Sequence, residues 1–287
     1  MKLYGAIEAG GTKFVCAVSD TDLNIIERVS YPTTTPAETL ELVFGFFDQY
    51  DLISIGIGSF GPIDVNQKSK TYGYVTSTPK IAWQNYDFLG AIKGRYHIPV
   101  AFTTDVNAAA LAEQRLGAAK GLDSCVYLTV GTGIGGGAVV NGEVLSGHSH
   151  PEMGHILTRI HPDETYEGFC PFHGQCLEGV AAGPAIEGRT GTKGHLLPED
   201  HPVWQMQAFY LAQAAMNYIL ILSPEKIIFG GGVMKQRHLF PLIRKELKIL
   251  MNNYIDMPEL ESFIVPPALE DNAGITGCLL LAKDVLN

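Results

Sequence analysis

Features that mark several classes of protein are missing from this 287-residue sequence. No stretch approaches 18 apolar residues without a break, which argues against a transmembrane helix. The opening residues, MKLYGAIEAGG, lack the long apolar stretch and small-residue cleavage site of a signal peptide. We therefore expect a cytoplasmic protein with no membrane partner.

Basic clusters and paired cysteines are also scarce. Lys and Arg total 20 against 30 Asp and Glu, a formal net charge of −10, and no dense basic run occurs. A nucleic acid partner is therefore not expected. Five cysteines, an odd number spread over a long chain, do not resemble a secreted disulfide framework. This again favours the cytoplasm.

The composition that is present is typical of a globular protein with a sizeable core. Hydrophobic residues make up 46% of the chain and charged residues 17%, which argues against disorder. The length suffices for two domains or one large one. No low-complexity linker occurs, so two halves would pack together at a cleft.

One pattern of elements occurs twice. Short apolar runs at 3–8 and 13–19 surround the turn AGGT, which predicts a β-hairpin. The same order of strand, glycine turn and strand returns at 125–140, so we expect two related halves. Further strands are expected near Ile25, over 52–58, up to Asp105 and at EKIIF, and helices over 37–50, 86–97, 106–117, 203–222, 235–254 and the tail.

Three glycine turns follow apolar strands: Gly10-Gly11-Thr12-Lys13, Gly131 to Gly137, and Gly230-Gly231-Gly232. Glycine lets backbone N–H groups crowd an anion, although a single turn of this kind is often purely structural. None fits GxxxxGK[ST], and the GxGxxG within GTGIGG lies between two strands instead of before a helix. A P-loop and a dinucleotide-binding motif are therefore not predicted.

Asp105 lies where a predicted strand meets the helix over 106–117. It can be the N-cap of that helix, or a catalytic base at the carboxyl end of a strand, where ligands of α/β sheets collect. The two roles are compatible only in part, because N–H groups that hold a carboxylate make it a weaker base.

The stretch GFCPFHGQCLE holds Cys170, His173 and Cys176, three zinc donors at tight spacing. A disulfide between the two cysteines would need an oxidising compartment and would leave His173 unexplained, so we favour zinc, which needs a fourth ligand. The other cysteines lie in apolar runs and are expected to be buried thiols: Cys16, Cys125 and Cys278.

Taken in order, Gly10-Gly11-Thr12, TDVNAA, TVGTGIGGG, HPEMGH and CPFHGQCLE resemble the ROK family of bacterial sugar kinases over essentially the whole chain. EAGGTKF, GIGSFGPID and STPK with the nearby Trp83 look most similar to its fructokinase branch. The resemblance implies an α/β, actin-like (hexokinase-type) ATPase fold with two ribonuclease-H-like domains around a cleft. We expect a small domain of residues 1–106 plus 272–287, and a larger domain of residues 107–271 that carries the zinc loop.

The resemblance also implies ATP-dependent phosphorylation of D-fructose to fructose 6-phosphate, with Mg²⁺ and commonly as a homodimer. Mannose, glucose or N-acetylmannosamine is the alternative acceptor. The family also contains sugar-responsive transcription regulators, which carry a helix-turn-helix module before the first hairpin. Only about seven residues precede Glu8 here and no basic stripe exists, so a regulator is less expected.

Family positions that bind ATP match residues of all three glycine turns. The resemblance assigns the β- and γ-phosphates to Gly10, Gly11, Thr12, Gly131, Thr132 and Gly133, and adenosine to Gly230, Gly231 and Gly232. Lys13 can add positive charge or point to solvent. Glu8 stands where most members carry an Asp that helps to hold magnesium through water, and it keeps the charge.

For the acceptor, the resemblance makes Asp105 the general base that takes the proton of the sugar hydroxyl. Thr104 stands where family glucokinases carry a sugar-binding Asn, which favours fructose or mannose. Family sugar contacts match Glu152, His155 and Glu178, with Gly61 and Pro62 in the loop that faces the sugar. Taken alone, the two glutamates could equally be solvated surface acids.

The fourth metal ligand implied by the family is His155. The ligand set is then His155, Cys170, His173 and Cys176, with His173 in place of the family's middle cysteine. Four protein ligands leave no open position, so we expect a structural zinc.

Overall fold

The structure, a computed structural model, describes residues 2–286 and divides into two compact units. Unit 1 joins the segment that ends at Glu113 to Val144–Pro151 and to the segment that begins at Asp271. Unit 2 consists of Gln114–Glu143 and Glu152–Glu270. The domain boundaries expected from the family stay a prediction. They assign residues 107–113, Val144–Pro151 and Asp271 to the larger domain, whereas these residues lie in unit 1.

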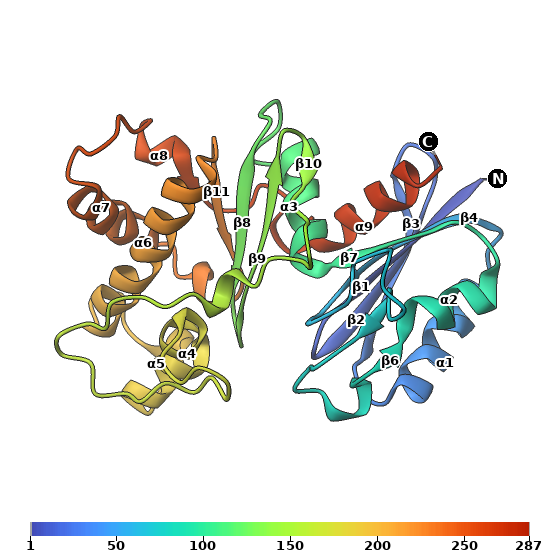
Figure 1. The fold of residues 1–287 in the computed structure, drawn as a ribbon, viewed down its shortest axis with the longest axis horizontal. Helices are drawn as coiled ribbons and strands as arrows, with labels where there is room; N and C mark the ends of the chain where they lie inside the picture. The colour runs from blue at the N-terminus through green and yellow to red at the C-terminus, as the bar shows by residue number, and fades with distance from the viewer. Residues whose placement is uncertain (1, 287) are drawn as a thin grey trace. The chain divides into compact units, whose positions relative to one another are not determined.

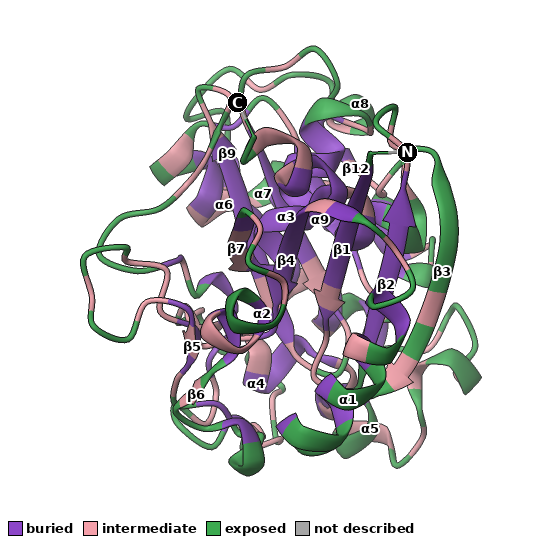
Figure 2. Cartoon of the chain, turned by 90° about the vertical axis from the view of Figure 1, so that its right-hand side faces the viewer, coloured by how far each residue is buried: buried purple, intermediate pink, exposed green. Residues whose placement is uncertain are grey.

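The sheet of unit 1 has the strand order β3-β2-β1-β4-β7. β1 (Leu3–Ala9) pairs antiparallel with β2 (Lys13–Ser19), which pairs antiparallel with β3 (Ile25–Pro32). β4 (Leu52–Ser59) and β7 (Val100–Thr104) continue the sheet in parallel with β1. Figure 2 shows β1, β2 and β4 as buried and β3 as the exposed edge.

Helices cover both faces of this sheet, as its continuous apolar strands require. Residues of α1 (Pro36–Phe47) and α2 (Phe88–Tyr96) join one core cluster, and residues of α9 (Ala273–Asp284) and α3 (Asp105–Arg115) join the other. In Figure 1, α9 runs beside β1 and β4. Thr35 begins α1 with a capping box that includes Glu38.

The sheet of unit 2 repeats the same arrangement, with the strand order β10-β9-β8-β11-β12. β8 (Cys125–Val130) pairs antiparallel with β9 (Ile134–Val140) and parallel with β11 (Ile227–Gly230), which pairs parallel with β12 (Ile264–Val265). The repeat of two related halves is thus confirmed. The helices of this unit are α4 (Leu177–Ala181), α5 (Gly183–Thr190), α6 (Val203–Leu222), α7 (Leu239–Met251) and α8 (Leu260–Phe263).

Short elements complete the chain. The remaining strands are β5 (Tyr74–Val75), β6 (Tyr86–Asp87) and β10 (Glu143–Val144), and the 3₁₀ turns are Ile81–Trp83, Met153–His155, Gly194–Leu196, Val233–Lys235 and Glu270–Asn272.

Several predicted boundaries differ from the structure by a few residues. Asp105 is the first residue of α3 instead of the last residue of a strand. The helix expected over 235–254 begins at Leu239, because Val233–Lys235 forms a separate 3₁₀ turn. All five cysteines are buried and free, as expected for Cys16, Cys125 and Cys278. Among the helices of residues 2–286, none is long and apolar enough to cross a membrane.

Candidate active site and metal centre

The first glycine turn, between β1 and β2, is held by Thr33, the residue that follows β3. Gly10 N–H donates to the carbonyl of Lys13 over 3.0 Å, which closes the turn. The hydroxyl of Thr33 donates to the carbonyl of Gly10 over 2.7 Å, and Thr33 N–H donates to that of Thr12 over 3.0 Å. The carbonyls of Gly10 and Thr12 are therefore hydrogen-bonded to Thr33, which fixes the conformation of the turn.

Two lysines lie near this turn. Lys13 is exposed, and its charge partly opposes the rise that burial causes in the pKa of Glu8. Lys80 was not predicted as a site residue, yet its Cε lies 3.7 Å from the position that a Cβ on Gly11 would occupy. The only sequence signal for Lys80 was its place in STPK, which carried the likeness to the fructokinase branch but no role.

Glu8 is half-buried in unit 1 and its carboxylate lies against the first turn of α9. Burial raises the pKa of Glu8, while Arg28, Lys13 and a hydrogen bond from Ile275 N–H act in the opposite direction. The Glu8 side chain is thus held by contacts with other residues of unit 1.

Thr104, and not Asp105, caps α3. The Thr104 hydroxyl accepts a hydrogen bond from Asn107 N–H over 3.1 Å, which is the N-cap contact to the third helical residue. Asp105 occupies the first helical position, half-buried, and its Oδ1 accepts from Val106 N–H over 2.9 Å. Asp105 therefore stands at the carboxyl end of β7, and the hydrogen bond from Val106 N–H helps to orient its carboxylate.

The loop that carries Gly61 and Pro62 is tied down at several points. Their peptide bond is cis, and the Pro62 carbonyl accepts from Thr76 N–H over 2.8 Å and from the Thr76 hydroxyl over 3.0 Å. One residue later, Ile63 N–H donates to Nε2 of His150 over 3.1 Å. His150 is buried, which lowers its pKa and keeps the ring neutral so that Nε2 can accept.

The predicted metal ligands come together in unit 2. His155, Cys170, His173 and Cys176 each present a donor atom, and these atoms all lie within 4.8 Å of one another. Nδ1 of His155 lies 3.6 Å from Sγ of Cys170 and 3.5 Å from Sγ of Cys176. Zinc bonds of about 2.0–2.3 Å in a tetrahedron place donor atoms about 3.5 Å apart. The residues therefore fit a tetrahedral Cys₂His₂ zinc site.

Local structure explains how these ligands converge. The Cys170 carbonyl accepts from Gly174 N–H over 2.9 Å, so the chain turns tightly around His173. Cys176 stands at the N-cap position of α4. Leu177 N–H donates to the carbonyl of Ile156 over 2.9 Å, which brings His155 beside the two cysteines.

His155 connects the metal ligands to a carboxylate. Its Nδ1 faces the two sulfur atoms, and its Nε2 lies 4.0 Å from Oε1 of Glu178. A carboxylate near the second nitrogen of a metal-bound histidine fixes the tautomer and the direction of the ring.

Glu178 is not a solvated surface acid. It is half-buried on α4, and its Oε2 accepts from Ile134 N–H at the start of β9 over 2.9 Å. A Cβ on Gly133 would lie only 2.5 Å from this oxygen, so Gly133 must lack a side chain for Glu178 to reach the strand. The structure thus joins a predicted sugar contact to a predicted phosphate turn.

Glu152, the third predicted sugar contact of unit 2, lies near the other two. The residue is exposed, but the protein displaces part of the water around its carboxyl group, which raises the pKa of Glu152. The charge of His155 lowers this pKa, and that of Glu178 raises it. The three residues therefore share one electrostatic environment.

The two glycine turns of unit 2 are neighbours. Gly131 N–H donates to the carbonyl of Gly133 over 2.9 Å, and the Gly131 carbonyl accepts from Gly183 N–H, at the start of α5, over 2.7 Å. The amide nitrogen of Gly232 lies 3.9 Å from the position of a Cβ on Gly131. Gly231 has φ +87°, a conformation that favours glycine. Residues 131–133 and 230–232 thus form one glycine-rich surface.

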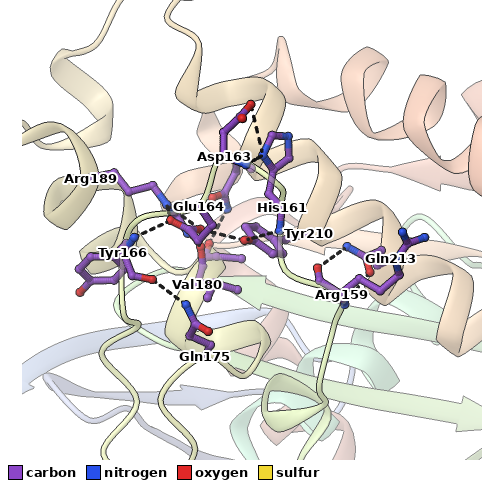
Figure 3. A network of polar contacts seen from close by, with 12 residues as sticks. Arg159, His161, Asp163, Glu164, Tyr166, Gln175, Val180, Arg189, Tyr210 and Gln213 are labelled. Atoms are coloured by element: carbon purple, nitrogen blue, oxygen red, sulfur yellow. Dashed lines mark hydrogen bonds and ion pairs between the residues drawn. The ribbon is translucent and has the colours of Figure 1, made fainter.

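A buried network that the sequence did not predict anchors the far end of α4 (Figure 3). Nη2 of Arg189 donates to Oε2 of Glu164 over 2.5 Å and to the carbonyl of Val180 over 2.6 Å. The Tyr210 hydroxyl also donates to Glu164, over 2.8 Å. The side chains of the ion pair are only 7% and 1% exposed, so the charges are paired inside the protein.

The predicted site residues divide between the two units. Unit 1 holds Glu8, Gly10, Gly11, Thr12, Lys13, Gly61, Pro62, Thr104 and Asp105; unit 2 holds Gly131, Thr132, Gly133, Glu152, His155, Cys170, His173, Cys176, Glu178, Gly230, Gly231 and Gly232. The metal ligands and Glu178 form one continuous cluster, and their roles stay predictions.

Comparison with known proteins identifies the family. The profile of the ROK family matches residues 4–285. This chain belongs to the ROK family. A relative from Bacillus subtilis is 54% identical over 99% of this chain and 96% of its own. A fructokinase from Streptococcus mutans is 50% identical over 99% of this chain and 98% of its own.

The fold prediction is confirmed as well. The crystal structure of a ROK hexokinase from Thermus thermophilus superposes with a TM-score of 0.80 at 25% identity, covering 99% of both chains. The mixed sheets of the two units, each a hairpin extended by parallel strands, agree with the expected actin-like ATPase fold.

Proposed function

We propose that this ROK protein is a fructokinase, which transfers the γ-phosphoryl group of ATP to the 6-hydroxyl of D-fructose. The observation that carries the proposal is the 50% identity to the Streptococcus mutans fructokinase over nearly all of both chains. The acids and glycine turns described above supply the groups that such a reaction needs.

Asp105 is the proposed general base. The sugar oxygen attacks the γ-phosphorus, its proton passes to the Asp105 carboxylate, and ADP leaves with the electrons of the broken phosphorus–oxygen bond. The hydrogen bond from Val106 N–H orients the carboxylate. A loose transition state needs positioning and charge neutralisation more than a strongly basic group.

Acceptor binding is assigned to the residues that match sugar contacts of the family. Glu152, His155 and Glu178 offer polar groups to sugar hydroxyls, each of which both donates and accepts hydrogen bonds. Gly61 and Pro62 shape the loop that would face the sugar. Thr104 lacks the amide of family glucokinases and its hydroxyl serves α3 as a cap, which supports fructose over glucose.

Nucleotide binding is assigned to the three glycine turns. Gly10, Gly11 and Thr12, with Gly131, Thr132 and Gly133, would bind the phosphates, and Gly230, Gly231 and Gly232 the adenosine. Mg²⁺ would neutralise phosphate charge near Glu8. Lys13 is a candidate cation, and we add Lys80 because its Cε lies beside Gly11.

The metal centre is proposed to bind zinc through His155, Cys170, His173 and Cys176. With four protein ligands, the zinc would hold the loop that leads into α4 and would take no part in bond breaking. We also propose a cytoplasmic homodimer, on the strength of the family resemblance.

A hexose panel tests the function. ATP-dependent ADP release should be fastest, in kcat/KM, with fructose, compared with mannose, glucose and N-acetylmannosamine. The Asp105→Asn variant should lose at least about 10²-fold in kcat while it still binds ATP and unfolds at the wild-type temperature. A higher kcat/KM for glucose than for fructose would overturn the acceptor, and full turnover in the variant would overturn the base.

A further inference from the structure

Glu8 occupies a defined face of β1. Neighbouring side chains of this strand alternate between two core clusters: Ile7 joins the cluster with α1 and α2, whereas Tyr4 and Ala6 join the cluster with α9. Because strand side chains alternate, Glu8 lies on the face that α9 covers. The first glycine turn begins two residues later, at Gly10.

The carboxylate of Glu8 meets the first turn of α9. A Cβ on Gly274 would lie 2.5 Å from the carboxyl carbon of Glu8 and 3.0 Å from Oε2, so only glycine leaves room for the acid. Ile275 N–H donates a hydrogen bond to the same carboxylate. Glu8 therefore supplies an acceptor oxygen to an N–H group that the helix itself leaves unpaired.

The residue that would usually cap this helix is engaged elsewhere. Asn272 is the N-cap residue of α9, but its side chain makes no capping hydrogen bond. Its Oδ1 instead accepts from Nη1 of Arg28, on β3, over 2.5 Å. Glu8, which is far away in the sequence, thus takes over the capping role.

α9 in turn contacts the helix that begins with Asp105. A Cβ on Gly277 would overlap the carbonyl of Ala108, so the backbones of α9 and α3 touch without side chains between them. At Gly58 of β4, a Cβ would lie 3.0 Å from Sγ of Cys278 and 3.2 Å from Cα of Asp105. With so little space, a shift of α9 must also move the start of α3.

We infer that Glu8 is a positioning residue: it holds the N-terminus of α9 and, through α9, sets the position of Asp105 relative to the first glycine turn. The inference rests on the proposed function for the roles of Asp105 and the turn, but the contact between Glu8 and α9 does not. A residue that served only the magnesium ion would need its charge, whereas this role needs the length of the side chain and an acceptor oxygen.

Three substitutions separate these requirements. Glu8→Gln keeps the length and an acceptor oxygen but loses the charge, Glu8→Asp keeps the charge but is one methylene shorter, and Gly274→Ala fills the space of the carboxylate. We expect Glu8→Asp and Gly274→Ala each to lower Tm by about 3–6 °C. We expect their kcat to fall at least about 10-fold, because Asp105 is displaced. Glu8→Gln should keep Tm within about 2 °C of wild type.

The double variant and a matched control sharpen the test. In Glu8→Asp with Gly274→Ala, the shorter acid leaves room for the new methyl group, so the loss of Tm should be smaller than the sum of the two single losses. Gly45→Ala is the control, because Gly45 also lies in a helix and has nothing within 4 Å of a Cβ. It should keep Tm and kcat.

The outcomes are distinguishable. Wild-type Tm in Glu8→Asp, together with a higher Mg²⁺ requirement in Glu8→Gln, would overturn the positioning role in favour of the cation. Strictly additive Tm losses in the double variant would also contradict it. If the wild-type protein phosphorylates no hexose, the proposed function fails, while the Tm pattern still decides whether Glu8 holds α9.

Discussion

Each unit joins a glycine turn to a helix through a glutamate, but in opposite directions. In unit 1 the acid is on the hairpin, at Glu8, and it reaches the helix α9 at Ile275 N–H. In unit 2 the acid is on the helix, at Glu178, and it reaches the hairpin at Ile134 N–H. In both units a glycine leaves the space for the acid, Gly274 in one and Gly133 in the other.

The two helices differ in what holds them. α9 has 12 residues and packs along β1 and β4 with an apolar face. α4 has five residues, too few to be stable alone, and it lies between Cys176 at one end and the Arg189 contact at the other. The same kind of contact therefore depends on ordinary core packing in unit 1, and on the cluster of four proposed metal ligands and a buried ion pair in unit 2.

Removal of the metal should have the largest effect, and it should act on unit 2. Cys170→Ser, or chelation, removes a thiolate ligand or the zinc itself, so α4 loses its N-terminal support and Glu178 its fixed position. We expect zinc content to fall from one per chain to near zero and KM for fructose to rise at least about 10-fold, with little change in ATP binding.

Metal analysis and a fluorescent-nucleotide titration measure these effects. Cys125→Ala is the matched control, a buried cysteine of unit 2 outside the cluster, and it should keep its zinc. An unchanged KM for fructose after verified zinc loss would show that α4 does not need the metal.

The second-largest effect is expected from loss of the buried ion pair between Arg189 and Glu164. Arg189→Met leaves Glu164 charged, nearly inaccessible and without its cation, which costs about 3–5 kcal/mol of unfolding free energy. It also releases the carbonyl of Val180 on α4, so KM for fructose should rise. Urea unfolding and steady-state kinetics measure the two effects.

The exposed Arg159 supplies the control for this change. Arg159→Met should alter unfolding free energy by less than about 0.5 kcal/mol. The double variant Arg189→Met with Glu164→Met should recover part of the loss, because no unpaired charge remains. A single variant as stable as wild type would mean that the network does not support α4.

The sequence predicted those parts of the site that depend on local spacing. The hairpins, the long helix over 203–222 and the cluster of Cys170, His173 and Cys176 all came from residues close together in the chain. The sequence left open whether Asp105 caps α3 or acts as a base, and the structure gives the cap to Thr104. Both residue types are good N-caps, so only the structure shows which side chain accepts.

The contacts that position the acids were not predictable in this way. Arg189 and Glu164 are 25 residues apart, and each alone has the pattern of a surface charge. Glu8 meets Gly274 across almost the whole chain. A glycine inside the predicted C-terminal helix was a signal of close approach, but it could not name the partner.

The third prediction compares the acids directly. Glu178→Ala removes the acceptor for Ile134 N–H and the partner of His155, so kcat/KM for fructose should fall about 10–100-fold. Glu178→Gln keeps an oxygen for Ile134 and should lose less. Glu187→Gln, an exposed acid on α5, is the control and should keep wild-type kinetics. Equal losses in the Ala and Gln variants would show that only the charge of Glu178 matters. Glu178 would then differ from Glu8, whose proposed role needs an acceptor oxygen.

The smallest expected effect is a difference between Glu164 and Glu8 in how each changes the unfolding free energy at low pH. Burial alone would raise the pKa of Glu164, but hydrogen bonds from Arg189, Tyr166 N–H and Tyr210 lower it below its usual 4.5. The stability that this carboxylate contributes is therefore present above about pH 4.5 and is lost as the pH falls through its lower folded value. The pKa of Glu8, by contrast, is raised by burial, so protonation favours the folded state there.

Measurements of unfolding free energy between pH 7 and pH 3 distinguish the effect of Glu164 from that of Glu8. The gap between wild type and Glu164→Gln should be widest near pH 7 and should narrow in acid, because the wild-type carboxyl is then protonated as well. For Glu8 the change with pH should be opposite. As the pH falls, the wild-type protein should gain stability relative to Glu8→Gln, because protonation removes the cost of burying a charge. A gap for Glu164→Gln that stays constant with pH would mean that Arg189 does not stabilise the ionised acid, and the support of α4 would then rest on the metal cluster alone.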